Sequence, residues 1–324
     1  MANDCAVCYV ADVNFLLPSL ISAVSLRKFI RPDQAEVFVF LVGENDLVAK
    51  VNEAASRFQI SVVPFDSGWA GEFDAGDFNK THVTPTALGR FFLDRGLPDR
   101  IERIVYIDGD TLIRRDPSAL IEAVVPEGKF AAAEDMVSFR YSRFTPRGRL
   151  KMAYLDGIGV HPPTQGYFNS GVFAVSRKSW RVIADDAFRF FIRNIKACEY
   201  HDQSALNATV GDRRLKLSLK WNFQTPYRFL GIEKFIEPCV YHFHSFPKPW
   251  MGECQPWPEI HAEYRAAVKP FESLNLPLKT LSEEALAGHN TLNWRKKLLL
   301  KSPLAGKVAL MHLGIADYEK NAWL

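Results

Sequence analysis

The sequence lacks the features that would place the protein in a membrane, outside the cell or on nucleic acid. Its 324 residues contain no apolar run of about 18, so no membrane-spanning helix is expected. The first residues, MANDCAVCYV, lack the basic start, apolar core and cleavage site of a secretory signal, which predicts a cytoplasmic protein. The net charge is only +3, which does not indicate nucleic acid as a partner.

Cysteine is also scarce. The five cysteines are odd in number and irregularly spaced, so a disulfide framework is not expected. Cys5 and Cys8 form a lone C-x-x-C inside the apolar run CAVCYVA, which is typical of a buried strand. Residues three apart on a strand point to opposite faces, so these two thiols cannot bind one metal together. We expect both to be small core residues.

Strand and helix signals alternate along the chain. Hydrophobic residues make up 48% of the sequence and charged residues 24%, the balance of a soluble globular protein. The first 65 residues read as β-α-β-α-β, which predicts parallel strands covered by helices. The expected elements there are strands at 5–11, 36–42 and 59–63 and helices at 15–29, with Asn14 as N-cap, and 46–57.

Beyond residue 63 we expect a long polar loop, and such loops in compact domains usually serve a site. The loop covers 64–85. Further expected elements are strands at 103–107, 130–133 and 168–176 and helices at 86–95, 177–194 and 202–209.

A pair of aspartates gives the strongest chemical signal. The buried strand RIVYI runs directly into Asp108, and Asp110 follows two residues later. In α/β sheets the ligand crevice lies at the carboxyl ends of strands, and carboxylates there suit Mg²⁺ or Mn²⁺ bound to substrate phosphates. The metal would neutralise a leaving diphosphate. Taken alone, D-x-D also fits two exposed turn residues.

Three other segments carry polar residues of interest. In YHFHSFPKPW, His242 can complete a metal shell and Lys248 can bind phosphate, although His242 with His244 is a rival H-x-H pattern. In GYFNSGVFAVS, Asn169 either begins a turn or bonds sugar hydroxyls. In HDQSALN, Asp202 and Gln203 either cap a helix or face a reacting sugar.

Together these four elements, in this order and spacing, resemble glycosyltransferase family 8, the retaining GT-A enzymes, from about residue 7 to residue 250. The resemblance implies an α/β fold with a Rossmann-like mixed sheet flanked by helices. It also implies a nucleotide-sugar-binding catalytic domain at 1–250 and a mostly helical C-terminal extension at 251–324.

The resemblance also implies residue roles. Asp108, Asp110 and His242 look like the ligands of Mn²⁺, or Mg²⁺, and Gln203 looks like the amide beside the anomeric carbon, with Asp202 as the neighbouring carboxylate. The remaining implied contacts go to the UDP-sugar donor, and they are made by Ala11, Asp12, Asn14, Arg90, Gly109, Asp135, Asn169, Ser245 and Lys248. Two positions depart from the family's pattern: Ser245 replaces a usual glycine, and the spacing from Arg90 to Asp108 is one residue longer.

The implied activity is retaining transfer of galactose or glucose from a UDP-sugar to a saccharide or glycolipid acceptor, as in surface polysaccharide or lipopolysaccharide synthesis. Retention allows a covalent intermediate on Asp202 or same-face attack, and we favour the latter because Gln203 is a poor nucleophile. The alternatives are an inactive nucleotide-sugar-binding relative and a haloacid-dehalogenase-like phosphohydrolase, which expects Thr where Leu112 stands. The basic, leucine-rich stretch at 294–301 is either an ordinary surface helix or a peripheral membrane contact.

Overall fold

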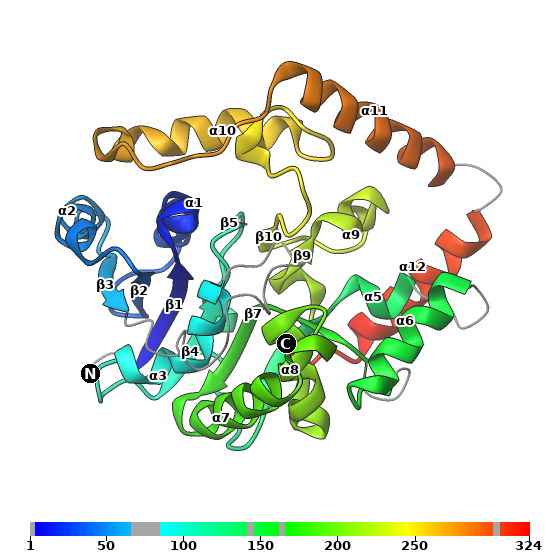
Figure 1. Cartoon of the computed structure of the whole chain (residues 1–324), viewed down its shortest axis with the longest axis horizontal. Coiled ribbons are helices and arrows are strands. Elements are labelled where there is room, and N and C mark those ends of the chain that lie inside the picture. The colour runs from blue at the N-terminus through cyan, green and yellow to red at the C-terminus, as the bar shows by residue number, and fades with distance from the viewer. Residues whose placement is uncertain (1–3, 66–84, 141–145, 162–165, 301–304) are drawn as a thin grey trace.

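The computed structural model describes residues 4–65, 85–140, 146–161, 166–300 and 305–324. The loop predicted at 64–85 lies almost entirely outside these residues. The described chain is built on a seven-stranded sheet in the order β3-β2-β1-β4-β7-β6-β8 (Figure 1). Its strands are β1 (Cys5–Ala11), β2 (Glu36–Val42), β3 (Ser61–Phe65), β4 (Arg103–Ile107), β6 (Phe130–Glu134), β7 (Phe168–Ser176) and β8 (Arg214–Leu217).

The direction of β7 makes the sheet mixed. Strands β1, β2 and β3 are parallel, as the β-α-β-α-β order predicts, and β4 pairs parallel with β1. Strand β7 lies antiparallel to both β4 and β6, and β6 pairs parallel with β8. The predicted mixed sheet of an α/β fold is therefore confirmed. Because β7 is reversed, its first residues lie at the edge where β4 ends.

Helices cover both faces of the sheet (Figure 1). One face carries α1 (Val13–Arg27), α2 (Asn45–Ser56) and α10 (Pro258–Val268), and the other carries α7 (Arg177–Arg193), α8 (His201–Val210), α3 (Leu93–Gly96) and the 3-10 helix η3 (Pro85–Phe92). Side chains of β1 alternate between these two faces, since Cys5 belongs to one apolar cluster and Cys8 to the other. The prediction that these thiols point apart is confirmed.

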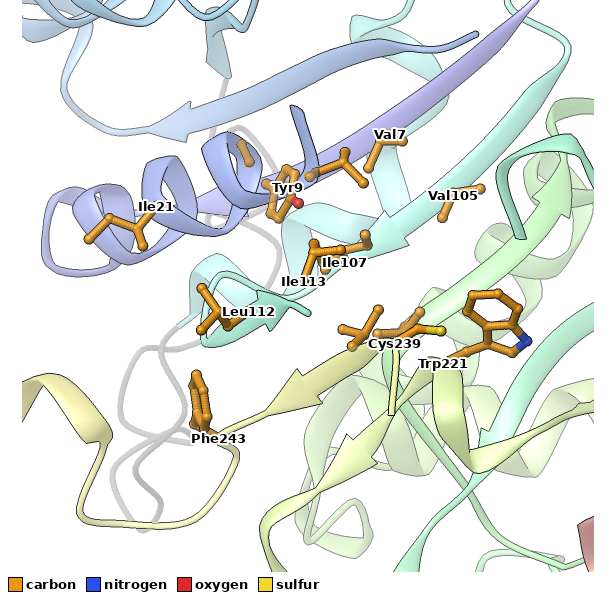
Figure 2. Packing of buried hydrophobic residues seen from close by; sticks show 14 of the residues in the cluster. Val7, Tyr9, Ile21, Val105, Ile107, Leu112, Ile113, Trp221, Cys239 and Phe243 are labelled. Atoms are coloured by element: carbon orange, nitrogen blue, oxygen red, sulfur yellow. The ribbon is translucent and has the colours of Figure 1, made fainter. Parts of the chain in front are cut away.

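A second, small sheet completes the site's scaffold. It has the order β5-β10-β9, with β5 (Thr111–Ile113), β10 (Val240–His242) and β9 (Phe223–Gln224). Strand β10 is antiparallel to β5, and the register sets His242 opposite Thr111. Figure 2 shows the buried side chains that pack the small sheet against the main one, among them Leu112, Ile113 and Cys239 beside Ile107. This packing places His242 next to the residues that follow β4.

Two local expectations need correction. The N-cap of α1 is Asp12 and not Asn14, because the carboxylate of Asp12 accepts hydrogen bonds from the backbone N–H groups of Asn14 and Phe15. The strand expected at 59–63 begins two residues later, because Gln59 has a positive φ of 57° that belongs to the turn after α2. The helix expected at 86–95 is formed by η3 followed by the single turn α3.

The last described helix is anchored to the edge of the main sheet. Tyr318 of this helix, α12 (Ala305–Lys320), donates to the carbonyl of Leu217, 2.7 Å away, and accepts from the backbone N–H of Glu134 at 3.1 Å. The carboxylate of Glu319 accepts from the backbone N–H of Leu219 at 2.7 Å. The other helices are α4 (Ser118–Glu122), α5 (Met136–Arg140), α6 (Pro146–Gly157), α9 (Thr225–Phe229) and α11 (Glu283–Leu300).

The C-terminal part is mostly helical, as predicted, and α11 slopes down at the upper right of the view toward α12 (Figure 1). The division near residue 250 stays a prediction. Within the described ranges, every helix is too short or too polar to cross a membrane.

Candidate metal centre and its polar surroundings

The site forms where β4 ends and β7 begins. Asp108 follows the last residue of β4, and its backbone N–H donates to the carbonyl of Gly171, 2.7 Å away on the reversed strand β7. This contact joins the D-x-D segment to Asn169 and its neighbours. The polar residues of two distant segments therefore share one edge of the sheet, as the position of the strand ends predicts.

Asp108, Asp110 and His242 converge on one point. Each offers one ligand atom, and these atoms all lie within 4.8 Å of one another. The Nε2 atom of His242 lies 3.3 Å from Oδ1 of Asp110 and 3.7 Å from Oδ2 of Asp108. Two carboxylate oxygens and one imidazole nitrogen form a donor set suited to Mn²⁺ or Mg²⁺.

Gly171 leaves the room that this donor set needs. A Cβ at this position would overlap the ring of His242 and the carboxylate of Asp108. The neighbouring Gly109 is constrained in the same way, because a Cβ there would overlap the side chain of Ser19. The close approach of the β7 backbone to His242 and Asp108 therefore requires glycine at position 171, and the residues present fit a bound cation.

Lys248 balances the charge of Asp110. Its Nζ lies 2.7 Å from Oδ2 of Asp110 and also donates to the carbonyl of Phe243 at 2.6 Å. Burial by itself raises the pKa of Asp110, but the charge of Lys248 and the side-chain contacts of Asp110 with Lys248 and His242 outweigh burial and hold this pKa well below its usual range. Asp110 is therefore an ionised carboxylate, the form that binds a metal.

Arg90 lies between two further carboxylates. Its Nη2 is 3.0 Å from Oδ1 of Asp108, and its Nη1 is 3.1 Å from Oδ2 of Asp202. Its Nη1 also donates to the carbonyl of Ser170 at 3.0 Å, and its Nε donates to the carbonyl of Ala87 at 3.0 Å. Each nitrogen of the guanidinium thus has a protein partner, and Arg90 links the metal ligands to α8.

Two buried side chains and the partly buried Gln203 form a polar cluster beside the metal centre. Oδ2 of Asp135 accepts from Nδ2 of Asn169 at 3.1 Å and from Nε2 of Gln203 at 3.2 Å. Nδ2 of Asn169 also donates to Oε1 of Gln203 at 3.0 Å. Burial raises the pKa of Asp135, and it also raises the pKa of Asp202 in spite of the nearby charge of Arg90. The predicted sugar-contacting residues are thus brought together.

The remaining predicted residues lie around this centre. Ala11 ends β1 and is buried, Asp12 caps α1 and accepts from the hydroxyl of Thr86 at 3.3 Å, and Asn14 is exposed. Ser245 lies in the loop between His242 and Lys248. It is absent from the described non-glycine residues with positive φ, which are Gln59, His201 and Asn275, so it needs no glycine-like backbone there. His244 lies outside the ligand cluster, which takes His242 instead.

Sequence reasoning missed three residues that complete the centre. The hydroxyl of Tyr106 donates to Oδ1 of Asp108 at 2.7 Å, and the alternation of side chains along β4 would have predicted this shared face. Ser170 donates its hydroxyl to Oδ2 of Asp202 at 3.0 Å. Asn222 lies 2.8 Å from Nδ1 of His242 through its Oδ1, and no local pattern signals this contact.

The chain is similar to several known proteins. A model described as Glycosyl transferase family 8 matches residues 6–254. General stress protein A of Bacillus subtilis (strain 168) is 28% identical over 207 residues, 58% of this chain and 68% of that protein. Probable galacturonosyltransferase-like 4 of Arabidopsis thaliana is 24% identical over 185 residues, 56% of this chain and 52% of that protein.

Among solved structures, the galactosyltransferase LgtC in complex with donor and acceptor sugar analogues is similar in fold. The TM-score is 0.63 at 21% identity, and the similarity covers 90% of this chain and 99% of that one. The predicted fold class is confirmed.

Proposed function

Because the chain belongs to glycosyltransferase family 8, we propose that this glycosyltransferase moves a hexose, galactose or glucose, from a UDP-sugar to a saccharide acceptor with retention at the anomeric carbon. Membership of this family excludes the alternative of a haloacid-dehalogenase-like phosphohydrolase. The observation that carries the proposal is the convergence of Asp108, Asp110 and His242 beside the polar cluster of Asp135, Asn169 and Gln203.

The proposed metal is Mn²⁺, or Mg²⁺, held by Asp108, Asp110 and His242. When bound, the cation neutralises the charge that grows on the departing diphosphate. Lys248 adds a second positive charge at the same edge, since its Nζ already lies 2.7 Å from Asp110. The proposed uracil and ribose contacts are Ala11, Asp12 and Asn14 at the end of β1, with Gly109 and Ser245 near the diphosphate.

A neutral hexose fits the sugar side of the site better than a hexuronic acid does. Asp135 and Asp202 are buried carboxylates there, and a sugar carboxylate beside them adds repulsion. Arg90 is the nearest cation to Asp202, but its nitrogens are already bound to Asp108, Asp202 and backbone carbonyls. Although one relative is named a probable galacturonosyltransferase, we therefore propose glucose or galactose as the transferred group.

We favour same-face attack as the route to retention. Gln203 is an amide and hence a weak nucleophile, and its Nε2 is bound to Asp135. Asp202 is the alternative nucleophile, but Oδ2 of Asp202 is already held by Arg90 and Ser170. In same-face attack, the leaving phosphate accepts the proton of the acceptor hydroxyl, and Gln203 and Asp135 orient the sugar. Trapping a glycosyl ester on Asp202 would overturn this preference.

The proposed acceptor is a saccharide or glycolipid of surface polysaccharide or lipopolysaccharide synthesis. We also propose a peripheral membrane contact through the basic, leucine-rich stretch at 294–301. This part of the proposal rests on the sequence, because the side chains there lie outside the described residues.

A screen of UDP-sugars for Mn²⁺-dependent hydrolysis tests the proposal, because donor breakdown needs no knowledge of the acceptor. The panel is UDP-glucose, UDP-galactose and UDP-galacturonic acid, each with Mn²⁺ and with a chelator. We expect release of UDP from one of the neutral hexose donors only when Mn²⁺ is present. Binding of UDP-sugars without hydrolysis of any of them would favour the inactive relative instead.

A further inference from the structure

We propose that Asn222 is a positioning residue that holds His242 in the tautomer able to bind a metal and carries this orientation to the amide of Gln203. The proposal rests on the proposed function, since it concerns the metal and sugar sides of the same site. Asn222 immediately precedes β9 and is fully buried, with 0% of its surface exposed. A buried amide of this kind has fixed hydrogen-bond partners.

The direction of the hydrogen bonds can be deduced from one backbone group. The N–H of Gly171 can only donate, and it lies 3.0 Å from Oδ1 of Asn169, which must therefore be an acceptor. The side chain of Asn222 lies 2.8 Å from the same Oδ1 atom of Asn169, so Asn222 must donate to it through Nδ2. The orientation of the Asn222 amide is thereby determined.

The other end of Asn222 selects the tautomer of His242. With its NH₂ group on Asn169, Asn222 presents Oδ1 to Nδ1 of His242 at 2.8 Å, and an acceptor there requires a proton on Nδ1. In the neutral ring that binds a metal, the lone pair is then on Nε2, which faces Asp110 and Asp108. Without Asn222, Nε2–H could instead donate to Asp110, and the ring would present no lone pair to a cation.

The same chain of amides continues to the sugar side. Because Oδ1 of Asn169 is directed toward Gly171 and Asn222, its Nδ2 is left for Asp135 and for Oε1 of Gln203. The backbone N–H of Ser170 also donates to Oε1 of Gln203, at 3.3 Å. Gln203 must therefore direct its Nε2 toward Asp135. The amide chain Asn222–Asn169–Gln203 thus orients a metal ligand and the proposed sugar-facing amide together.

Two substitutions separate the two parts of this role. Asn222→Ala removes the acceptor on Nδ1, so we expect the affinity for Mn²⁺ in the presence of UDP to fall about 10- to 100-fold. Asn222→Asp keeps an acceptor on Nδ1, but its second oxygen cannot donate to Asn169. We expect its Mn²⁺ affinity to equal or exceed that of the wild type, while UDP-sugar hydrolysis falls at least about tenfold because Gln203 loses its orientation.

The measurement is a titration with Mn²⁺ in the presence of UDP, in which the free ion is followed by its paramagnetic resonance signal. It reports binding without turnover. Asn52→Ala is the control. The side-chain amide of Asn52 also makes a structural hydrogen bond, since its Oδ1 accepts from the backbone N–H of Val62 at 2.8 Å, but Asn52 lies away from the site. We expect this variant to bind Mn²⁺ like the wild type. Nitrogen NMR of labelled histidine gives a second readout, since wild-type His242 should carry its proton on Nδ1.

Equal Mn²⁺ affinity of Asn222→Ala and the wild type would overturn the inference while leaving the proposed function intact. If Asn222→Ala fails to fold, Asn222→Asp decides, and a tenfold or greater loss of Mn²⁺ affinity in that variant overturns the inference. A wild-type protein that binds no Mn²⁺ with UDP would overturn the proposed metal site itself, and this inference with it.

Discussion

Gly171 packs directly against the imidazole of His242, and the space between them is too small for a Cβ. Gly171→Ala should therefore displace His242 or Asp108, and we expect weaker Mn²⁺ binding and a loss of about 1–3 kcal/mol in the free energy of unfolding. Gly288→Ala is the matched control, because a Cβ at this helical position meets nothing within 4 Å. Urea unfolding and a metal titration of both variants check the prediction, and wild-type affinity in Gly171→Ala would contradict it.

Removing one proposed metal ligand should abolish the metal-dependent reaction without unfolding the protein. We expect His242→Ala and Asp110→Asn each to lower Mn²⁺-dependent hydrolysis of the donor by more than about a hundredfold. Loss of a residue that only supports a metal ligand typically lowers activity about 10- to 100-fold, and loss of a ligand itself should cost more. Circular dichroism should show a retained fold. Asp33→Asn serves as the control, since Asp33 forms an exposed ion pair with Arg31. Full activity of either variant in the presence of a chelator would contradict the proposed metal site.

The anchoring of α12 should contribute to stability. Tyr318→Phe removes the acceptor of the Glu134 backbone N–H and the donor to Leu217, both in the interior. A buried group left without its partner costs about 1–3 kcal/mol, and we expect a loss of that size in urea unfolding. Asp317→Asn, on the exposed side of the same helix, should change the free energy of unfolding by less than about 0.5 kcal/mol. Similar values for the two variants would show that α12 is not held by Tyr318.

The buried thiols should make the protein sensitive to alkali. Burial raises the pKa of Cys254 from 9.0 to about 11 and that of Cys198 from 9.0 to about 12. Between pH 9 and these values the unfolded chain releases protons that the folded chain keeps, so the free energy of unfolding falls as pH rises through this window. Below pH 9 this contribution is fully present.

Unfolding at pH 8 and pH 10.5, in the wild type and in Cys198→Ala, measures this effect. We expect a smaller decline with pH in the variant. A disulfide-exchange reagent should also label the native protein slowly at pH 8, and all five thiols after denaturation. Rapid labelling of the native protein would show that the thiols are accessible.

The main strands and the aspartate pair could be predicted because both depend on short-range patterns. A buried strand that runs into two carboxylates places them at a sheet edge, whatever the rest of the chain does. The strand at 36–42 was predicted with the bounds that β2 has in the structure, since its apolar run ends at clear turn residues. His242 could be predicted through its spacing to Lys248, which resembles the family's.

Other features depend on long-range pairing and have no local signal. Asn222 contacts His242 only because β9 and β10 lie side by side, and a single asparagine before a two-residue strand looks like any turn residue. The buried ion pair of Arg214 and Glu134, 2.7 Å apart, joins strands β8 and β6 and has no pattern in the sequence. The cap of α1 was misplaced because Asp12 and Asn14 both suit an N-cap, and local preference does not choose between them.

Because β7 is reversed, the site combines two groups of residues that are separate in the sequence, the proposed metal ligands and the proposed sugar contacts. The proposed metal ligands Asp108 and Asp110 follow β4, whereas Asn169, a proposed sugar contact, lies near the start of β7. The segment between β6 and β7, which carries Asp135, is therefore separate in sequence from the turn that carries Asp108 and Asp110, although the two meet at one edge of the sheet. We therefore expect changes in the length or composition of this segment to alter the preference for the transferred sugar more than the affinity for the metal.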